Sequence, residues 1–145
     1  MRSSPRSNGG CGSEGRGMDP DQIKEGYREM IGRVPPKVAA RIDLFADLDA
    51  QALSRMEELR ADFLDSSTIP AKYVQLMVFA ILLTQTSPAA KFHALAAIRA
   101  GATPNELLDA TKVAFLFRGL AAMNHAGEIL TEVFAESEAA APVAD

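Results

Sequence analysis

Few side chains in this 145-residue sequence have a type and setting that suit chemistry. His93 could act as a general acid or base near neutral pH. Gln75 lies in an apolar run, so its amide needs a hydrogen-bond partner, which His93 or a ligand carbonyl would supply. We therefore take His93 and Gln75 as candidate catalytic residues. Each also has a purely structural interpretation, His93 as a satisfied core or interface residue and Gln75 as a buried amide.

Four further residues are candidate ligand-binding residues. Thr86 and Ser87 stand at the expected start of the helix that carries His93, where they would cap it and where free N–H groups suit a carboxylate. Lys72 and Arg118 could attract an anionic ligand, or they could be ordinary solvated charges. His125 is too far from His93 in the sequence to suggest ligand spacing, so we expect no metal site and no cofactor.

Composition excludes several classes of protein. The net charge is −4 and no dense run of Lys or Arg occurs, which argues against a nucleic-acid-binding surface. No apolar stretch approaches the roughly 20 residues of a membrane span, so we expect no membrane association and a cytoplasmic location. The one cysteine, Cys11, excludes an intrachain disulfide framework.

The chain divides into three parts by composition. Residues 1–18 are rich in Gly, Ser and Arg and poor in apolar side chains, so we expect a disordered extension, with Met18 a plausible alternative start. Residues 19–136 form the expected helical domain, and residues 137–145 a disordered tail.

Helical periodicity runs through the whole middle part, and no segment alternates as a strand would. Asp19 and Gly32 bound the first expected helix, and Thr103 to Glu106 form a capping box. The remaining expected helices follow Pro35-Pro36 and cover about 53–64, 70–84, 88–100 and 120–134. In the helix over 53–64 the expected apolar stripe is Leu53, Met56, Leu59, Phe63 and Leu64. The sequence therefore predicts an all-α fold of six to seven helices.

Two of these helices are apolar on nearly every side. One is the segment from Tyr73 to Leu83, and the other is the end of the helix that contains Phe115 and Phe117. A helix without a polar face has to be covered all round. An oligomer whose subunits cover each other satisfies this requirement, and a centrally placed helix pair in a monomer is the alternative.

A family resemblance appears across Ile69 to Leu130. Ile69-Pro70-Ala71-Lys72, a long apolar helix, His93 and the run Gly101-Ala102-Thr103-Pro104-Asn105-Glu106 resemble the carboxymuconolactone decarboxylase/alkylhydroperoxidase D-like family. The resemblance implies an all-α domain with a buried central helix, assembled as a homotrimer or homohexamer.

The peroxidase branch of that family uses Cys-x-x-Cys-x-x-x-His with a glutamate on the preceding helix. The positions that match the two cysteines hold Thr86 and Ala89. The glutamate position falls on Gln75 or Val74, depending on the end from which one counts. Thiol peroxidase chemistry needs a thiolate and a resolving thiol, so we do not expect it here.

Two main hypotheses follow, with a third behind them. The first is a non-redox enzyme, a lyase or hydrolase in type, that acts on a small organic acid or lactone with His93 as general acid/base. The second is a catalytically silent helical oligomer that serves in binding or assembly. Residual alkylhydroperoxidase or peroxiredoxin-type activity is the third. An open pocket where His93 meets a basic side chain would favour the enzyme, and filling by Phe79, Phe92 and Phe115 would favour the silent oligomer.

Overall fold

The computed structural model describes residues 17–141 and shows an all-α fold there, as the sequence predicts. Seven helices make up this part of the chain, and it contains no strand. They are α1 (Pro20–Ile31), α2 (Pro36–Leu48), α3 (Ala50–Leu64), α4 (Ala71–Thr84), α5 (Ala90–Arg99), α6 (Pro104–Arg118) and α7 (Leu120–Ala140). Residues 1–16 and 142–145, on which most of the expected terminal disorder falls, lie outside the described residues.

The local signals for helix ends are the ones that the structure uses. The carboxylate of Asp19 accepts from the Asp21 N–H at 3.0 Å, and Gly32 ends α1 with a φ of 82°. Such a left-handed φ costs glycine little because it has no Cβ. Thr103 and Glu106 form the reciprocal capping box at the start of α6.

Three helix boundaries differ from the expected ones. Helix α3 starts three residues before Leu53 because Asp49 caps it, accepting from the Ala52 N–H at 2.9 Å. Helix α5 begins at Ala90, later than Pro88. Helix α7 continues to Ala140, past the expected end near Phe134, because the Ala and Glu residues that follow are strong helix formers. None of the described helices is long and apolar enough to cross a membrane.

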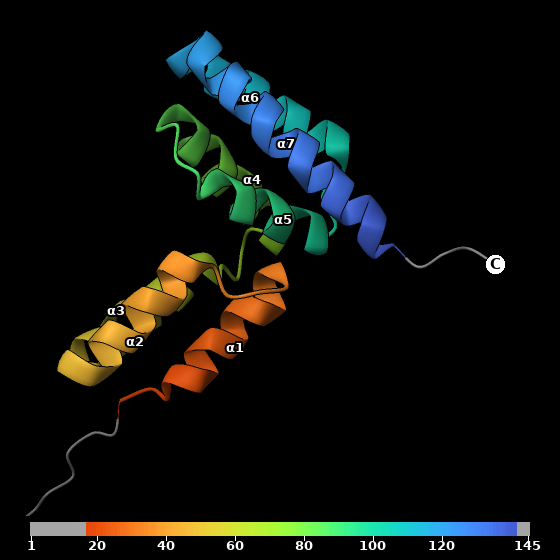
Figure 1. Ribbon diagram of the computed structural model, residues 1–145. Helices are drawn as coiled ribbons and strands as arrows, with labels where there is room; N and C mark the ends of the chain where they lie inside the picture. Colours follow the sequence, from red (N-terminus) through yellow and green to blue (C-terminus); the bar gives the residue numbers. More distant parts are fainter. Residues whose placement is uncertain (1–16, 142–145) are drawn as a thin grey trace, which may run out of the picture.

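Buried side chains form two clusters, each enclosed mainly by one of two groups of helices. Figure 1 shows these two groups, α1 to α3 and α4 to α7. Helices α4, α5, α6 and α7 enclose the larger cluster, which includes Phe79, Leu83 and Leu107. Helices α1, α2 and α3 enclose the smaller one, which includes Tyr27 and Ile42. Burial of these apolar side chains is the main stabilising contribution to both groups.

Helix α5 joins the two clusters. Ala94 and Ala97 pack into the larger cluster, whereas Ala96 and the half-buried Phe92 pack into the smaller one. The small alanine side chains let neighbouring helices approach α5 from both sides. His93 therefore stands on the helix at which the two groups of helices meet.

Two helices leave apolar side chains exposed within a single chain. Tyr73, Met77 and Ile81 leave one side of α4 exposed, so α4 is not covered all round by the described residues of its own chain. In α3 the expected stripe is only partly buried, since Leu53 is buried but Phe63 is 71% exposed, whereas Glu57 is 3% exposed. The reason is that Arg41 and Arg60 neutralise the buried Glu57 carboxylate, which hydrophobic periodicity could not indicate.

Candidate functional site

His93 and Gln75 are hydrogen-bonded to each other. The imidazole Nδ1 of His93 on α5 lies 2.8 Å from the amide Oε1 of Gln75 on α4. Because an amide oxygen can only accept, Nδ1 carries the proton and Nε2 keeps a free lone pair. Of the two residues that could match the family glutamate, Gln75 is thus the one that forms a hydrogen bond with His93. Its amide nitrogen lies 3.7 Å from the sulfur of Met30 on α1.

The imidazole of His93 is held in its neutral form. Burial and then the positive charge of Arg60 lower the pKa of His93 to about 4. Burial acts in this direction because it penalises the charged imidazolium. At neutral pH the side chain is therefore a base with an available lone pair on Nε2.

The second ring nitrogen of His93 is accessible. Nε2 has no hydrogen-bond partner among the described residues, and no side-chain nitrogen or oxygen in that part of the chain is both fully buried and unpaired. Nε2 must therefore reach solvent-accessible space. His93 also lines a hollow, called here the His93 hollow, which is the space that this nitrogen can use.

The His93 hollow lies between the two groups of helices and has a volume of about 370 Å³. This size lies within the range of pockets that hold small molecules. Its walls are mainly apolar, and the residues that line it are Tyr27, Met30, Ile31, Pro35, Val38, Arg60, Phe63, Leu64, Val78, Ala89, Phe92 and His93. Phe79 is buried in the larger cluster and Phe115 is exposed on α6, so neither fills the hollow, and Phe92 forms part of its wall.

A buried charge cluster on α1, α2 and α3 borders this hollow. The Glu57 carboxylate lies 2.6 Å from Nη2 of Arg41 and 2.9 Å from Nε of Arg60. Burial alone would raise the pKa of Glu57, but hydrogen bonds from Arg60 and Arg41 outweigh it and lower that pKa. The Tyr27 hydroxyl accepts from Arg41 at 3.0 Å and lies 3.4 Å from both carboxylate oxygens. Glu57 is thus ionised between two guanidinium groups.

The sequence alone does not reveal this cluster. Leu53, Glu57, Arg60 and Leu64 follow one another at i, i+4, i+7 and i+11, which is a helix face as regular as the apolar stripe that was expected. Two charged residues in that series would ordinarily indicate a solvent-facing side. The spacing of Glu57 and Arg60, one helical turn apart, does indicate an ion pair. It does not indicate burial, because the other partners of Glu57, Tyr27 and Arg41, lie on different helices.

The four expected ligand-binding residues lie in different places. Lys72 forms an ion pair with Glu106 at 2.8 Å, and Arg118 is exposed in the last turn of α6. Neither lines the His93 hollow. Thr86 is exposed and adopts a left-handed φ of 49°, and its hydroxyl contacts the Gln85 carbonyl.

Ser87 lies nearer to the His93 hollow but does not cap α5. The residue at the N-cap of α5 is Ala89, without a side-chain cap, and the Ser87 hydroxyl accepts from the Ala89 N–H at 3.3 Å. Ser87 lines a neighbouring hollow of about 570 Å³, which shares Pro35, Val38, Ala89 and Phe92 with the His93 hollow. The Ser87 carbonyl is 2.9 Å from Nε2 of His125, so His125 holds this loop against α7.

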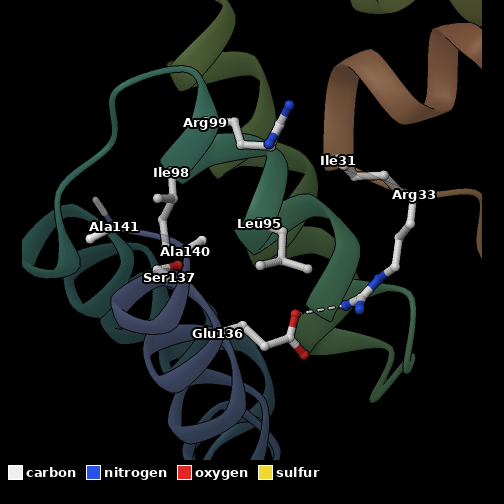
Figure 2. A pocket seen from close by; sticks show the side chains of 10 residues that line it. Ile31, Arg33, Leu95, Ile98, Arg99, Glu136, Ser137, Ala140 and Ala141 are labelled. Carbon is white, nitrogen blue, oxygen red and sulfur yellow. Dashed lines mark hydrogen bonds and ion pairs between the residues drawn. The ribbon is translucent and has the colours of Figure 1, made fainter. Parts of the chain in front are cut away.

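A separate hollow of about 400 Å³ lies where the end of α1 meets α5 and α7. Figure 2 shows Arg33 and Glu136 pointing toward each other across it, and their ion pair measures 2.8 Å. The charges that line this hollow are thus largely paired, and neither histidine is among its residues. Within residues 17–141, no three His, Cys, Asp or Glu side chains are grouped to hold a metal ion.

The described residues thus form an all-α fold with a neutral histidine beside an apolar hollow. Comparison with known proteins identifies the family of the chain. The model of the carboxymuconolactone decarboxylase family matches residues 50–132, more than half of the chain. The chain belongs to this family, which confirms the resemblance found in the sequence. The match begins at residue 50 in α3, ahead of Ile69, and so includes Glu57 and Arg60.

A solved structure supports the fold. The crystal structure of a protein assigned as a carboxymuconolactone decarboxylase, from Burkholderia xenovorans LB400, matches with a TM-score of 0.68. The match covers 84% of this chain and 96% of that one at 19% sequence identity, which establishes similarity of fold. No protein with a curated description matches this chain.

Proposed function

We propose that this protein is a non-redox enzyme, a lyase or hydrolase in type, that acts on a small organic acid or lactone. His93 is its general acid/base and Gln75 its positioning residue. The observation that carries the proposal is the pairing of Nδ1 with the Gln75 amide beside an open hollow, with Nε2 accessible. The low pKa of His93 keeps the Nε2 lone pair unprotonated at neutral pH, as a general base requires, and makes the imidazole a weaker base than an ordinary histidine.

The chemistry follows from the two ring nitrogens. A carbon–hydrogen bond of the substrate, next to an unsaturated or carbonyl group, breaks as its proton moves to Nε2. The electron pair remains on the substrate and delocalises into that group. The imidazolium that forms still donates from Nδ1 to the Gln75 oxygen, which stabilises the positive charge but cannot accept the proton. The electron pair then forms a carbon–carbon double bond as the bond from the adjacent carbon to the lactone oxygen breaks, and Nε2 passes its proton to the carboxylate that leaves. Reversal of the first step in D₂O puts deuterium on carbon.

The experiment that tests this function is solvent isotope exchange. Wild-type protein is incubated in D₂O with a panel of small β,γ-unsaturated acids and lactones, and deuterium at carbon is measured by NMR. We expect exchange with at least one compound, and a loss of about 10²- to 10⁴-fold in His93→Ala. Added imidazole should restore part of the rate, because it supplies the missing base. Asn124→Ala, which changes an exposed polar residue of α7, is the control.

A His93→Ala variant that folds and exchanges at the wild-type rate would contradict the role of His93. So would a loss of exchange that imidazole leaves unchanged over its full soluble range, since the histidine would then act only in maintaining the structure. Absence of exchange with the whole panel would favour the silent oligomer.

We also propose that the protein assembles as a homotrimer or homohexamer. Tyr73, Met77 and Ile81 form an exposed apolar stripe at i, i+4 and i+8 on α4. Leu116, Phe117 and Leu120 are each more than 70% exposed near the junction of α6 and α7. Exposed apolar surface of this kind is typical of protein–protein contacts. A second copy of the chain would bury both groups. These exposed apolar side chains also support the alternative function, a catalytically silent helical oligomer.

Thiol peroxidase activity has less support. Thr86 and Ala89 occupy the positions of the two family cysteines, and Cys11 lies outside the described residues. Protein that begins at Met18 contains no cysteine, and we expect it to leave an organic hydroperoxide unreduced in the presence of a dithiol. Robust hydroperoxide reduction by that shortened protein would overturn this expectation.

A further inference from the structure

Arg60 is held rigidly at the edge of the His93 hollow. Its Nε donates to the Glu57 carboxylate at 2.9 Å, and its guanidinium carbon lies 4.2 Å from the centre of the Tyr27 ring. The side chain is one-third exposed, and it lines both the His93 hollow and an adjoining hollow on which Gln75 lies. These contacts fix the guanidinium plane while leaving part of it accessible.

The charges around Arg60 do not balance. Glu57 carries one negative charge and contacts two guanidinium groups, those of Arg41 and Arg60. The Tyr27 hydroxyl is neutral, because burial raises the pKa of Tyr27. The cluster therefore has one positive charge more than it has negative ones. A site with one uncompensated, partly desolvated cation favours a ligand with one negative charge.

The donor groups of Arg60 are also incompletely used. Glu57 accepts only from Nε, and no described residue accepts from either Nη atom. A guanidinium edge with two free N–H groups matches the two oxygens of a carboxylate. Of the residues that line the His93 hollow, Arg60 is the one with a formal charge, and the rest of the wall is mainly apolar.

We propose that Arg60 binds the carboxylate of a small monocarboxylate whose apolar body occupies the His93 hollow. Binding of such a ligand does not depend on the proposed function. Only the reaction that follows rests on it, because there His93 has to reach a carbon atom of the bound molecule. A second carboxylate on the ligand would face apolar wall with no cation to pair with, so a dicarboxylate binds less well. A neutral molecule of the same shape leaves the guanidinium edge unpaired.

Binding of the carboxylate should also change the pKa of His93. The positive charge of Arg60 contributes to the low pKa of His93, so a carboxylate paired with Arg60 offsets that contribution. A bound monocarboxylate therefore raises the pKa of His93, whereas a neutral analogue does not.

The test uses benzoate as the probe, with benzyl alcohol as the neutral analogue and phthalate as the dicarboxylate. Affinities are measured by NMR titration of the full chain. We expect benzoate to bind more tightly than both, and Arg60→Gln to weaken benzoate roughly ten- to hundredfold with little effect on benzyl alcohol. Arg60→Lys should recover part of the loss, since it keeps the charge without the two-pronged geometry. Arg55→Gln, on an exposed position of the same helix, is the matched control.

Arg60→Gln also removes a partner of Glu57, so a measurement on wild-type protein accompanies it. The side-chain N–H signals of Arg60 should shift on addition of benzoate, and the pKa of His93 should rise. The proposal is overturned if these signals stay fixed, if benzoate shows no saturable binding at millimolar concentration, or if benzyl alcohol or phthalate binds as tightly. Equal benzoate affinity in a folded Arg60→Gln variant overturns it too.

These outcomes separate the binding role from the catalytic one. Benzoate affinity that depends on Arg60, in a protein without isotope exchange, supports the binding site and removes the proposed reaction. Isotope exchange that depends on His93, with benzoate affinity independent of Arg60, does the reverse.

Discussion

His93 on α5 and Gln75 on α4 are joined by one hydrogen bond of 2.8 Å, and this bond decides which imidazole nitrogen is free. The acceptor is an amide oxygen, so the bond holds a proton on Nδ1 without being able to take it. A carboxylate at the same place would behave differently, because it would attract the proton and stabilise an imidazolium.

Changing Gln75→Glu should therefore raise the pKa of His93 from about 4 to above its ordinary value near 6.5. The physical reason is the negative charge placed beside Nδ1 in a partly desolvated setting. An NMR titration of the imidazole signals measures the change, with the exposed Gln85→Glu as control. An unchanged pKa in Gln75→Glu would show that the two side chains do not contact each other in solution.

Stability should fall as the solution is made acidic, in part because of His93. The pKa of His93 is about 4 in the folded protein and about 6.5 in an unfolded chain. The unfolded state thus binds more protons between these two values, so the free energy of unfolding decreases as pH falls from about 6.5 to 4. The loss from this one group is of the order of 3 kcal/mol.

Chemical denaturation at a series of pH values measures this dependence, and His93→Asn isolates it because the carboxylates are common to both proteins. We expect the stability difference between wild type and His93→Asn to shrink as pH falls through this window. Parallel pH profiles for the two proteins would mean that His93 titrates normally in the folded state.

The Glu57 carboxylate should be a major contributor to the stability of the α1–α3 group. Removing its charge in Glu57→Gln leaves Arg41 and Arg60 facing each other, which we expect to cost about 2–4 kcal/mol in the free energy of unfolding. The value lies toward the lower end for buried pairs because both guanidinium groups are about one-third exposed. Urea denaturation provides the measurement. The exposed neighbour Glu58→Gln should change stability by less than about 0.5 kcal/mol, and an equal effect of the two substitutions would contradict the burial of Glu57.

Self-association should depend on the exposed stripe of α4. Placing charges there with the double substitution Met77→Glu and Ile81→Glu should convert a trimer or hexamer into monomers of about 15.5 kDa. Light scattering coupled to size-exclusion chromatography gives the mass directly, and Gln51→Glu on an exposed part of α3 is the control. A wild-type protein that is already monomeric at high concentration would rule out the assembly.

Much of the local structure could be read from neighbouring residues. Asp19, Gly32 and the Thr103–Glu106 capping box mark helix ends where the structure has them, because capping involves groups only a few positions apart. The absence of cysteine from residues 12–145 is likewise visible without coordinates. Gln75 also stands out in the sequence, because a polar amide in an apolar run needs a hydrogen-bond partner.

The three-dimensional arrangement was needed for everything that depends on residues far apart in the chain. Helical periodicity predicts that Phe63 is buried and that Glu57 is exposed, because it considers one helix at a time and treats every carboxylate as a sign of exposure. Tyr27, Arg41 and Glu57 come from three helices, and their charges and hydroxyl become compatible with burial only once packing brings them within hydrogen-bond distance. Arg60 reaches the hollow through that packing. The sequence alone thus specifies the helices and the absence of cysteine after Cys11, whereas contacts between residues far apart in the chain place Arg60 at the hollow that His93 lines.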